Sequence, residues 1–333
     1  MKKLNNSIVF SKSSNPWFNL ALEEHLFSTI HEDQVIMYLW QNNDTVVIGS
    51  NQNPWKECDL NKIEADGVKI ARRLSGGGAV YHDNGNLNFT FITDNALYDQ
   101  ERQMNVVLEA VNAFGVSATF SGRNDLLIDG KKFSGNAYFL GDKASFHHGT
   151  LLVCTDLMRL SKYLTPSNHK ILSKGIDSVS SRVVNLNSIK QEITIGGLQE
   201  SLIRSFQAEY GECATPKTFF QDSSTVQELA GLYEKYFSWQ WIFAESPSFE
   251  VHFEKDYDWG EIWIGLVLVD GCIHEMEIFT DTLVSTFVQK MKKALQGIPY
   301  DFHSVEKALL SVASTNEEKP LFEDILLLFK ECL

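Results

Sequence analysis

The sequence of 333 residues lacks paired cysteines, long apolar runs and an excess of positive charge. Its five cysteines are odd in number and form no C-x-x-C pair, which disfavours a disulfide framework or a zinc knuckle and indicates a reducing compartment. The longest apolar stretch, Ile262 to Val269, is far shorter than the ~20 residues of a membrane helix. No apolar stretch follows Lys2 and Lys3, so we expect no signal peptide and a cytoplasmic location.

The chain has 29 basic and 43 acidic residues, which gives a formal net charge of −14. This charge disfavours binding to nucleic acid or to an anionic membrane, because long-range repulsion opposes both. It leaves room for a local basic pocket that binds a small anion. Hydrophobic residues make up 44% of the chain and charged residues 22%, a globular composition that excludes a disordered or fibrous protein.

Turn and cap signals predict a large N-terminal domain that contains both strands and helices, followed by a small C-terminal α+β domain. Asn15 and Pro16 are typical of a helix N-cap and first helical position. The sequence pattern changes near residues 245–250, after Ser246-Pro247-Ser248, which predicts domains at residues 1–246 and 250–333. The other expected elements are strands at 35–40, 45–49, 261–269 and 272–279, and helices at 102–114, near 195, and at 284–296, 304–313 and 322–331.

A two-residue β-hairpin is predicted around Asp129 and Gly130, with Leu127 facing Lys132 across the strands. Strand alternation then divides the hairpin into two faces. The more apolar face holds Leu126, Ile128 and Phe133, and the opposite face holds Asp125, Leu127, Lys132 and Ser134. Lys132 is therefore expected to project away from the core, beside Asp125.

A glycine-rich segment from Arg72 to Asp83 reads Arg-Arg-Leu-Ser-Gly-Gly-Gly-Ala-Val-Tyr-His-Asp. Successive glycine N–H groups can form an anion-binding concavity, and we expect Arg72, Arg73 and Lys132 to converge on it. The segment is neither a P-loop nor a G-x-G-x-x-G motif. A flexible turn between strands is the alternative interpretation.

Two further segments carry polar groups. His147 and His148 are adjacent on a predicted strand and so face opposite sides, which disfavours a shared metal; one is expected to be structural and one to line a cleft. The Gly- and Ser-rich stretch from Lys174 to Val183 is a surface loop by itself and a candidate lid over a nucleotide in this context.

Together these segments resemble the lipoate–protein ligase A family. The resemblance implies an α/β (α+β) fold that is biotin/lipoate ligase-like, with a large catalytic domain of mixed β-sheets flanked by helices and a small C-terminal α+β domain. The resemblance covers about the first 245 residues, and the C-terminal segment resembles the family's accessory domain. The motifs that carry it are Trp17–Ala21, Thr45–Gly49, Gln52–Cys58, Arg72–Asp83, Gly122–Asp125, Lys132–Ala137 and His147–Leu152.

The resemblance implies a ligase that converts lipoate and MgATP to lipoyl-AMP and then lipoylates a lysine of an acceptor protein. It implies lipoyl domains of 2-oxoacid dehydrogenase E2 subunits and the glycine cleavage H protein as acceptors. Lys132 would be the catalytic residue, and Asp125 a magnesium ligand. The implied ATP-binding residues are Arg73, Gly78, Ala79, Val80, Tyr81, Asn124, Lys132 and Ser181; the implied lipoate-binding residues are Arg73, Ser75, His82 and Lys132.

Three alternatives remain at this point. A lipoyl or octanoyl amidotransferase would need a cysteine nucleophile with a lowered pKa; Cys58 and Cys154 are the candidates, and Cys154 is expected to be buried after an apolar run. A biotin ligase has a different basic glycine-rich loop. A noncatalytic lipoate carrier is disfavoured because Arg73 and Lys132 are both present.

Overall fold

A computed structural model describes residues 5–52, 54–121, 124–164, 183–243, 251–269, 272–300, 302–313 and 315–332. The chain divides into two compact units, which we describe separately. The first comprises Met1–Ile48, Pro54–Arg73 and Ala79–Ile242, and the second comprises Gly49–Asn53, Leu74–Gly78 and Phe243–Leu333. The expected domain boundary between residues 246 and 250 lies outside the described residues and stays a prediction.

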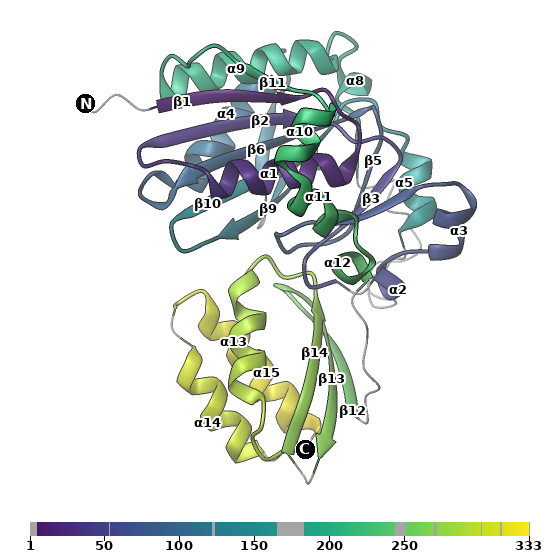
Figure 1. Ribbon diagram of the computed structural model, residues 1–333, viewed down its shortest axis with the longest axis vertical. Coiled ribbons are helices and arrows are strands. Elements are labelled where there is room, and N and C mark those ends of the chain that lie inside the picture. Colours follow the sequence, from purple (N-terminus) through teal and green to yellow (C-terminus); the bar gives the residue numbers. More distant parts are fainter. Residues whose placement is uncertain are drawn as a thin grey trace. The chain divides into compact units, whose positions relative to one another are not determined.

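The first unit is built on an eight-stranded mixed sheet (Figure 1). Strand β1 (Asn5–Ser11) runs parallel to both of its neighbours, and the other strand pairs of this sheet are antiparallel. In spatial order the strands are β11 (Lys217–Phe219), β1 (Asn5–Ser11), β2 (Gln34–Trp40), β6 (Asn86–Asp94), β10 (Ala144–Leu152), β9 (Lys131–Leu140), β8 (Asp125–Ile128) and β7 (Ala118–Ser121).

Helices cover both faces of this sheet. Helices α4 (Gln100–Asn112) and α9 (Ile195–Tyr210) pack on one face, where Met37, Phe89 and Phe91 belong to the main hydrophobic core. Helix α1 (Pro16–Ser28) lies over the opposite face, in contact with β6 and β10, and packs against α11 (Ala230–Phe237). The strands are therefore buried on both sides, and polar side chains on the α1 side must find partners within the protein.

The expected start of α1 is confirmed. The Asn15 side chain accepts hydrogen bonds from the backbone N–H groups of Trp17 and Phe18, and Pro16 takes the first helical position. The remaining short elements of the first unit are α2 (Pro54–Glu57), α3 (Leu60–Ala65), η1 (Asn95–Leu97), α5 (Leu157–Tyr163), α8 (Leu186–Ile189), α10 (Ser223–Glu228), α12 (Trp239–Phe243), and a small sheet of β4 (Lys69–Arg72), β3 (Thr45–Ile48) and β5 (Val80–His82).

The β8–β9 hairpin forms as predicted around its two-residue turn. Leu127 pairs with Lys132, and Asp129 and Gly130 both have positive φ, at 49° and 74°. The expected facing of Ser134 is wrong. A β-bulge shifts the register, so that Ser134 pairs with Leu126 and is fully buried on the core side, next to the equally buried Phe133.

The second unit is a three-stranded antiparallel sheet with three helices beside it (Figure 1). Its elements are β12 (Val251–Tyr257), β13 (Gly260–Val269), β14 (Cys272–Thr280), α13 (Ser285–Leu295), α14 (Phe302–Val312) and α15 (Glu318–Cys332). A separate hydrophobic core includes Ile262, Ile264, Phe287 and Phe322. The hairpin and the three helices agree with expectation, whereas β12 was not predicted.

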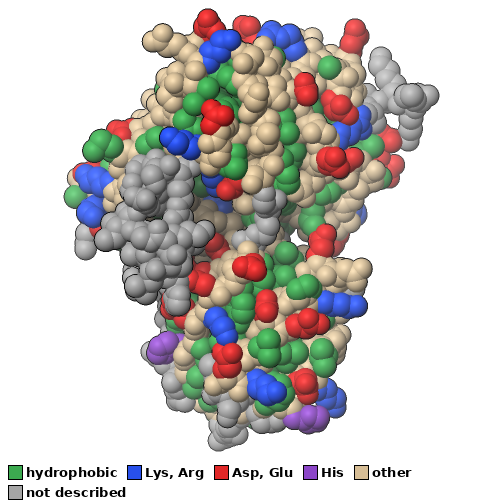
Figure 2. Space-filling view, turned by 180° about the vertical axis from the view of Figure 1, so that it is seen from behind, with side chains coloured by type: hydrophobic (Ala, Val, Ile, Leu, Met, Phe, Trp, Pro, Cys, Tyr) green, Lys and Arg blue, Asp and Glu red, His purple; other side chains and the backbone are tan. Residues whose placement is uncertain are grey.

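Most of the negative charge belongs to the second unit. Residues 243–333 contain 17 acidic and 7 basic residues, a net charge of −10 out of the chain's −14. On the face seen in Figure 2, acidic and basic side chains of this unit are interspersed. None of the helices within the described ranges has the length and apolarity needed to cross a membrane.

The turn of the β8–β9 hairpin gives a stability prediction. Gly130→Ala should lower the free energy of unfolding by about 1 kcal/mol, because a Cβ is strained at positive φ even though open space surrounds the position. Urea denaturation measures the difference. Gly196→Ala, on α9 with equally open surroundings and no positive φ, should cost nothing or add stability. Equal losses in the two variants would contradict the strain argument.

Candidate active site

Lys132 lies on β9 with its backbone fixed from two sides. Its carbonyl oxygen accepts a 2.8 Å hydrogen bond from the Val184 N–H, and the adjacent Phe133 side chain is anchored in the core. Its Nζ lies 2.7 Å from Asp125 Oδ1, which confirms the expected pairing of these two side chains. Both are about one-third exposed, so water screens the ion pair, whereas Lys131 is fully on the surface.

Gly135 makes room for the Lys132 ammonium. A Cβ at Gly135 would lie 2.9 Å from both Cε and Nζ of Lys132, so the lysine occupies the space that a side chain would fill. Residues three apart on a regular strand face opposite sides. The bulge at Phe133 removes this opposition and brings Lys132 and Gly135 to the same side.

This side of the large sheet, which we call the site face, carries two rows of residues across the strands. Strand pairing aligns Trp40, Asn88 and Thr150, and the Thr150 hydroxyl accepts a 3.2 Å hydrogen bond from Gly135 N. The neighbouring row consists of Tyr38, Thr90, His148 and Ala137. The small side chains at 135 and 137 thus lie at the same end of the face as Lys132.

Asn136 and His147 point to the opposite side, into the core. The Asn136 Oδ1 lies 2.9 Å from His147 Nε2, and burial lowers the pKa of His147 to about 3, so the ring is neutral. A Cβ at Gly149 would come within 2.4 Å of that same Oδ1. Asn124 also belongs to this group, because its side-chain amide donates to the Asn136 carbonyl at 3.0 Å.

His148 faces the other way and joins a buried polar chain under α1. Its Nδ1 lies 2.9 Å from Glu23 Oε1, which also accepts a 2.6 Å hydrogen bond from the Thr90 hydroxyl. The Trp40 indole in turn donates to Thr90 at 3.0 Å. The expected division of the two histidines is confirmed in their opposite facing. Glu23, Thr90 and Trp40 were not predicted, since Glu23 reads as one more residue of an amphipathic helix.

Arg73 and His82 come close to each other in the small sheet. Arg73 is buried and donates to the Val47 carbonyl at 3.2 Å. Burial lowers the pKa of His82 to about 3, with further contributions from the positive charge of Arg73 and from His148. The His82 Nδ1 lies 3.1 Å from Asn42 Nδ2, and the ring contacts Trp40 edge-on at a centroid distance of 6.1 Å.

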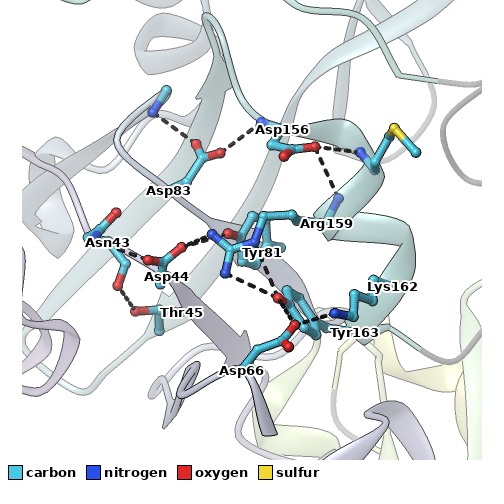
Figure 3. Close-up of polar contacts among 12 residues, drawn as sticks. Asn43, Asp44, Thr45, Asp66, Tyr81, Asp83, Asp156, Arg159, Lys162 and Tyr163 are labelled. Carbon is cyan, nitrogen blue, oxygen red and sulfur yellow. Dashed lines mark hydrogen bonds and ion pairs between the residues drawn. The ribbon is translucent and has the colours of Figure 1, made fainter. Parts of the chain in front are cut away.

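Tyr81 on β5 is held by a network of charged and phenolic groups (Figure 3). Its hydroxyl donates to Asp44 at 3.0 Å, and burial together with this hydrogen bond raises the pKa of Tyr81. Arg159 bridges Asp44 to the Tyr163 hydroxyl, which donates to Asp66 at 2.6 Å. The ring of Tyr81 is therefore structural, and only its backbone is available for the expected role, as for the half-buried Ala79 and Val80.

The glycine loop from Leu74 to Gly78 belongs to the second compact unit. The Gly77 N–H donates to the Thr282 carbonyl at 3.1 Å, and a Cβ at Gly76 would lie 2.0 Å from that carbonyl oxygen. Ser75 is fully buried, and its carbonyl accepts from Ser50 N at 2.9 Å. The expected concavity of successive free N–H groups is thus wrong at Gly77, whose N–H is already bonded to protein.

Arg72 does not join the other cations, contrary to expectation. It is buried, and its guanidinium donates to the carbonyls of Trp241 and Ile242 at the end of α12. The Trp241 indole returns a 2.8 Å hydrogen bond to the Arg72 carbonyl. Burial lowers the pKa of Arg72 to about 10. Alternation places Arg72 on the far side of β4, so adjacent arginines serve different purposes.

Two expected features lie elsewhere. Ser181, and most of the loop from Lys174 to Val183, fall outside the described residues. In the described part of the chain, no three His, Cys, Asp or Glu residues gather into a group that could hold a metal ion. Within the described residues, Asp125 is the carboxylate that forms an ion pair with Lys132.

The two candidate cysteine nucleophiles differ in their surroundings. Cys58 is buried, and burial, with a smaller contribution from Glu57, raises the pKa of its thiol to about 12. Cys154 is exposed, contrary to expectation, because the chain leaves β10 at Leu152 and its apolar run ends at Val153. A buried thiol with a raised pKa cannot act as a thiolate nucleophile at neutral pH.

Comparison with known families gives two matches. Residues 15–207 match the family described as the lipoyl protein ligase A/B catalytic domain, and residues 246–326 match the bacterial lipoate protein ligase C-terminus. A lipoate-protein ligase A of Psychrobacter cryohalolentis is 40% identical over 305 residues, which cover 90% of each chain. One of Blochmanniella pennsylvanica is 40% identical over 304 residues, again 90% of each chain.

Solved structures agree in fold. The crystal structure of P. falciparum LipL1 in complex with lipoate has a TM-score of 0.85 and 29% identity, covering 97% of this chain and 100% of that one. A bi-partite lipoate protein ligase of Thermoplasma acidophilum, solved in a study that includes its E2 lipoyl domain, has a TM-score of 0.63 and 26% identity, covering 74% of this chain and 100% of that one.

The cysteine environments predict different reactivity toward an alkylating reagent. In the folded protein at pH 8, iodoacetamide should modify Cys154 and leave Cys58 intact, because the thiolate is the reactive form and Cys58 remains a buried thiol. Mass spectrometry of peptides measures both sites, and alkylation in urea is the control in which both react. Rapid native modification of Cys58 would show that its thiol is accessible and ionised.

Proposed function

Because the chain belongs to the lipoyl protein ligase A/B catalytic domain family, we propose that it is an ATP-dependent lipoate–protein ligase. In the first step a lipoate carboxylate oxygen bonds to the α-phosphorus of ATP, and the bond to the leaving pyrophosphate breaks. In the second step the amine of an acceptor lysine bonds to the acyl carbon, loses a proton, and AMP leaves.

The observation that carries this proposal is the placement of Lys132 over Gly135 on the site face. A carboxylate that attacks a phosphate brings two anions together, and a fixed ammonium lowers that repulsion. Because Gly135 has no side chain, the ammonium can occupy this position, where we propose that a ligand oxygen contacts it. We propose that Lys132 contacts both the α-phosphate and the acyl carbonyl and stabilises the charge that develops in each step.

We propose that ATP and lipoate contact partly different residues of the chain. For ATP, the proposed residues are Arg73, the backbone from Gly78 to Tyr81, Asn124, Lys132 and Ser181. For lipoate, the proposed residues are Arg73, Ser75, His82 and Lys132. Arg73 and His82 support this assignment because both are buried polar groups beside the site face, where an uncharged imidazole and a guanidinium can meet an anionic or polar ligand.

Magnesium would enter with ATP. Mg²⁺ in nucleotide sites is held by one or two carboxylates together with phosphate oxygens and water. The single carboxylate of Asp125, one-third exposed beside Lys132, fits that use. When bound, the ion would neutralise phosphate charge, and Asp125 would then exchange part of its contact with the lysine for the metal.

The acceptor and the location complete the proposal. We propose lipoyl domains of 2-oxoacid dehydrogenase E2 subunits and the glycine cleavage H protein as acceptors, in the cytoplasm. Nucleic acid and membrane partners stay disfavoured by the charge of −14. Residues 243–333 carry −10 of that charge and the first unit −4, so the first unit repels an acidic acceptor less than the second unit does.

Removal of the ammonium tests the proposed function directly. Lys132→Ala should lower adenylate formation and acyl transfer by about 100-fold or more, because a fixed electrostatic donor is lost. The protein is incubated with ATP, magnesium and lipoate, with and without an acceptor domain, and the products are weighed by mass spectrometry. Lys131→Ala changes the exposed lysine next to it on β9, is the matched control and should act as wild type.

Transfer without adenylate, which Cys154→Ala then abolishes, would favour the amidotransferase instead. Near-normal rates in Lys132→Ala would remove the lysine from the reaction. Thermal unfolding should be almost unchanged in both lysine variants, since a partly exposed ion pair contributes little to stability.

Gly135 gives a steric test of the same site. Gly135→Ala should leave the fold intact, because the Lys132 side chain can swing away from the new Cβ, but the ammonium is then displaced. We expect a loss of activity approaching that of Lys132→Ala, measured in the same assay. If Gly135→Ala keeps full activity, the position of the ammonium seen here is not the one used in the reaction.

A further inference from the structure

A buried hydrogen-bond donor at His82 has no acceptor among the described residues. His82 is 3% exposed, and its Nε2 is enclosed without a hydrogen-bond partner, whereas its Nδ1 contacts Asn42. Proteins rarely bury a polar atom without a partner, because the atom loses its hydrogen bond to water. A group of this kind beside a proposed ligand site suggests that the ligand supplies the missing partner.

The orientation of the Asn42 amide follows from its neighbour Asn19. The Asn19 Nδ2 lies 3.0 Å from the Ser13 carbonyl and 2.8 Å from the Gln41 carbonyl, and carbonyl oxygens only accept. This atom is therefore the nitrogen, as drawn. It also lies 2.9 Å from the Asn42 side chain, so the Asn42 atom that faces it must be the oxygen.

The same reasoning fixes the proton of His82. Since the oxygen of Asn42 faces Asn19, its nitrogen faces His82 and donates to Nδ1 at 3.1 Å. A neutral imidazole whose Nδ1 accepts a hydrogen bond carries its proton on Nε2. The ring is neutral near pH 7, because burial lowers its pKa to about 3. Nε2–H is thus a donor that points away from Asn42.

The position of His82 relates this donor to one end of the acyl substrate. The row Gly135, Thr150, Asn88 and Trp40 crosses four strands, a span of about 14 Å at the usual strand spacing. Lys132 lies at the Gly135 end, and His82 contacts Trp40 at the other. Asn88 Nδ2, in the middle of the row, also has no hydrogen-bond partner among the described residues. A ligand whose carboxylate meets Lys132 and whose chain follows this row brings its far end toward His82.

We infer that Asn42 is a positioning residue that holds His82 as the Nε2–H tautomer, so that this donor meets a sulfur of the dithiolane ring and favours lipoate over octanoate. The inference rests on the proposed function. Ring sulfurs accept hydrogen bonds weakly and contact aromatic edges well. The Nε2–H of His82 supplies the hydrogen-bond donor, and Trp40 supplies the aromatic ring. An octanoyl chain offers no acceptor there and leaves Nε2–H without a partner.

The first experiment reads the tautomer in the intact wild-type protein. Long-range ¹H–¹⁵N correlation spectra of ¹⁵N-histidine protein at pH 7 should show His82 protonated at Nε2, with the signal assigned from its absence in His82→Gln. Protonation at Nδ1 overturns the inference. This readout needs no activity, so it separates failure of the inference from failure of the proposed ligase function.

The second experiment compares acyl substrates in Asn42→Leu, a variant of equal size without the amide donor. The kcat/KM for lipoate should fall by about 3- to 10-fold, the range expected for one hydrogen bond, while that for octanoate stays within twofold. Asn43→Ala is the matched control, since among the described residues the side-chain amide of Asn43 donates a hydrogen bond only to the neighbouring Asp44, at 3.3 Å. Equal losses for both substrates in Asn42→Leu would assign Asn42 to folding or to the carboxylate end.

Discussion

The alternation of side chains along β9 and β10, interrupted at one point by the bulge at Phe133, is the constraint on which the candidate site depends. Each residue in these strands points either into the core or to the site face. Outside the bulge, neighbouring residues of the segments 132–137 and 147–152 therefore have different roles, one in packing and the next at the site. Gly135 leaves space for the lysine, while the next residue, Asn136, ties His147 into the core. His148 then meets Glu23 on the site face, while Gly149 is small because Asn136 lies behind it. The same residues of β9 and β10 therefore alternate between the candidate site and the hydrophobic core.

Local patterns in the sequence were sufficient for several of the elements and for the lysine–aspartate pair. Asn15 caps its helix, and the Asp129-Gly130 turn closes its hairpin, because both effects act between residues close in the chain. Ser134 was placed wrongly because a bulge depends on packing across strands. Arg72 and Asn42 were missed or misplaced because their partners, Trp241 and Asn19, lie far away in sequence. Nothing in a local pattern reports such contacts.

The net charge of the whole chain does not describe the surroundings of the candidate site, because most of this charge belongs to the second unit. Taken as a whole, −14 describes an acidic protein that should repel anions. The positive groups of the site are few and are placed by structure: Lys132 by the bulge and Gly135, Arg73 by burial beside Val47. A neutral His82 adds a donor without adding charge. Such a site can bind an anion while the protein surface remains acidic.

The anchoring of β9 around Lys132 also bears on the entropy of ligand binding. Phe133 and Ser134, both fully buried, hold the backbone from the core side, and the hydrogen bond from Val184 holds it at the lysine carbonyl. Of the motions that a binding lysine normally loses, the backbone part has already been lost on folding. Only the side-chain torsions remain to be fixed when an anion arrives. The free energy of that contact is therefore not offset by the entropy cost of ordering the strand.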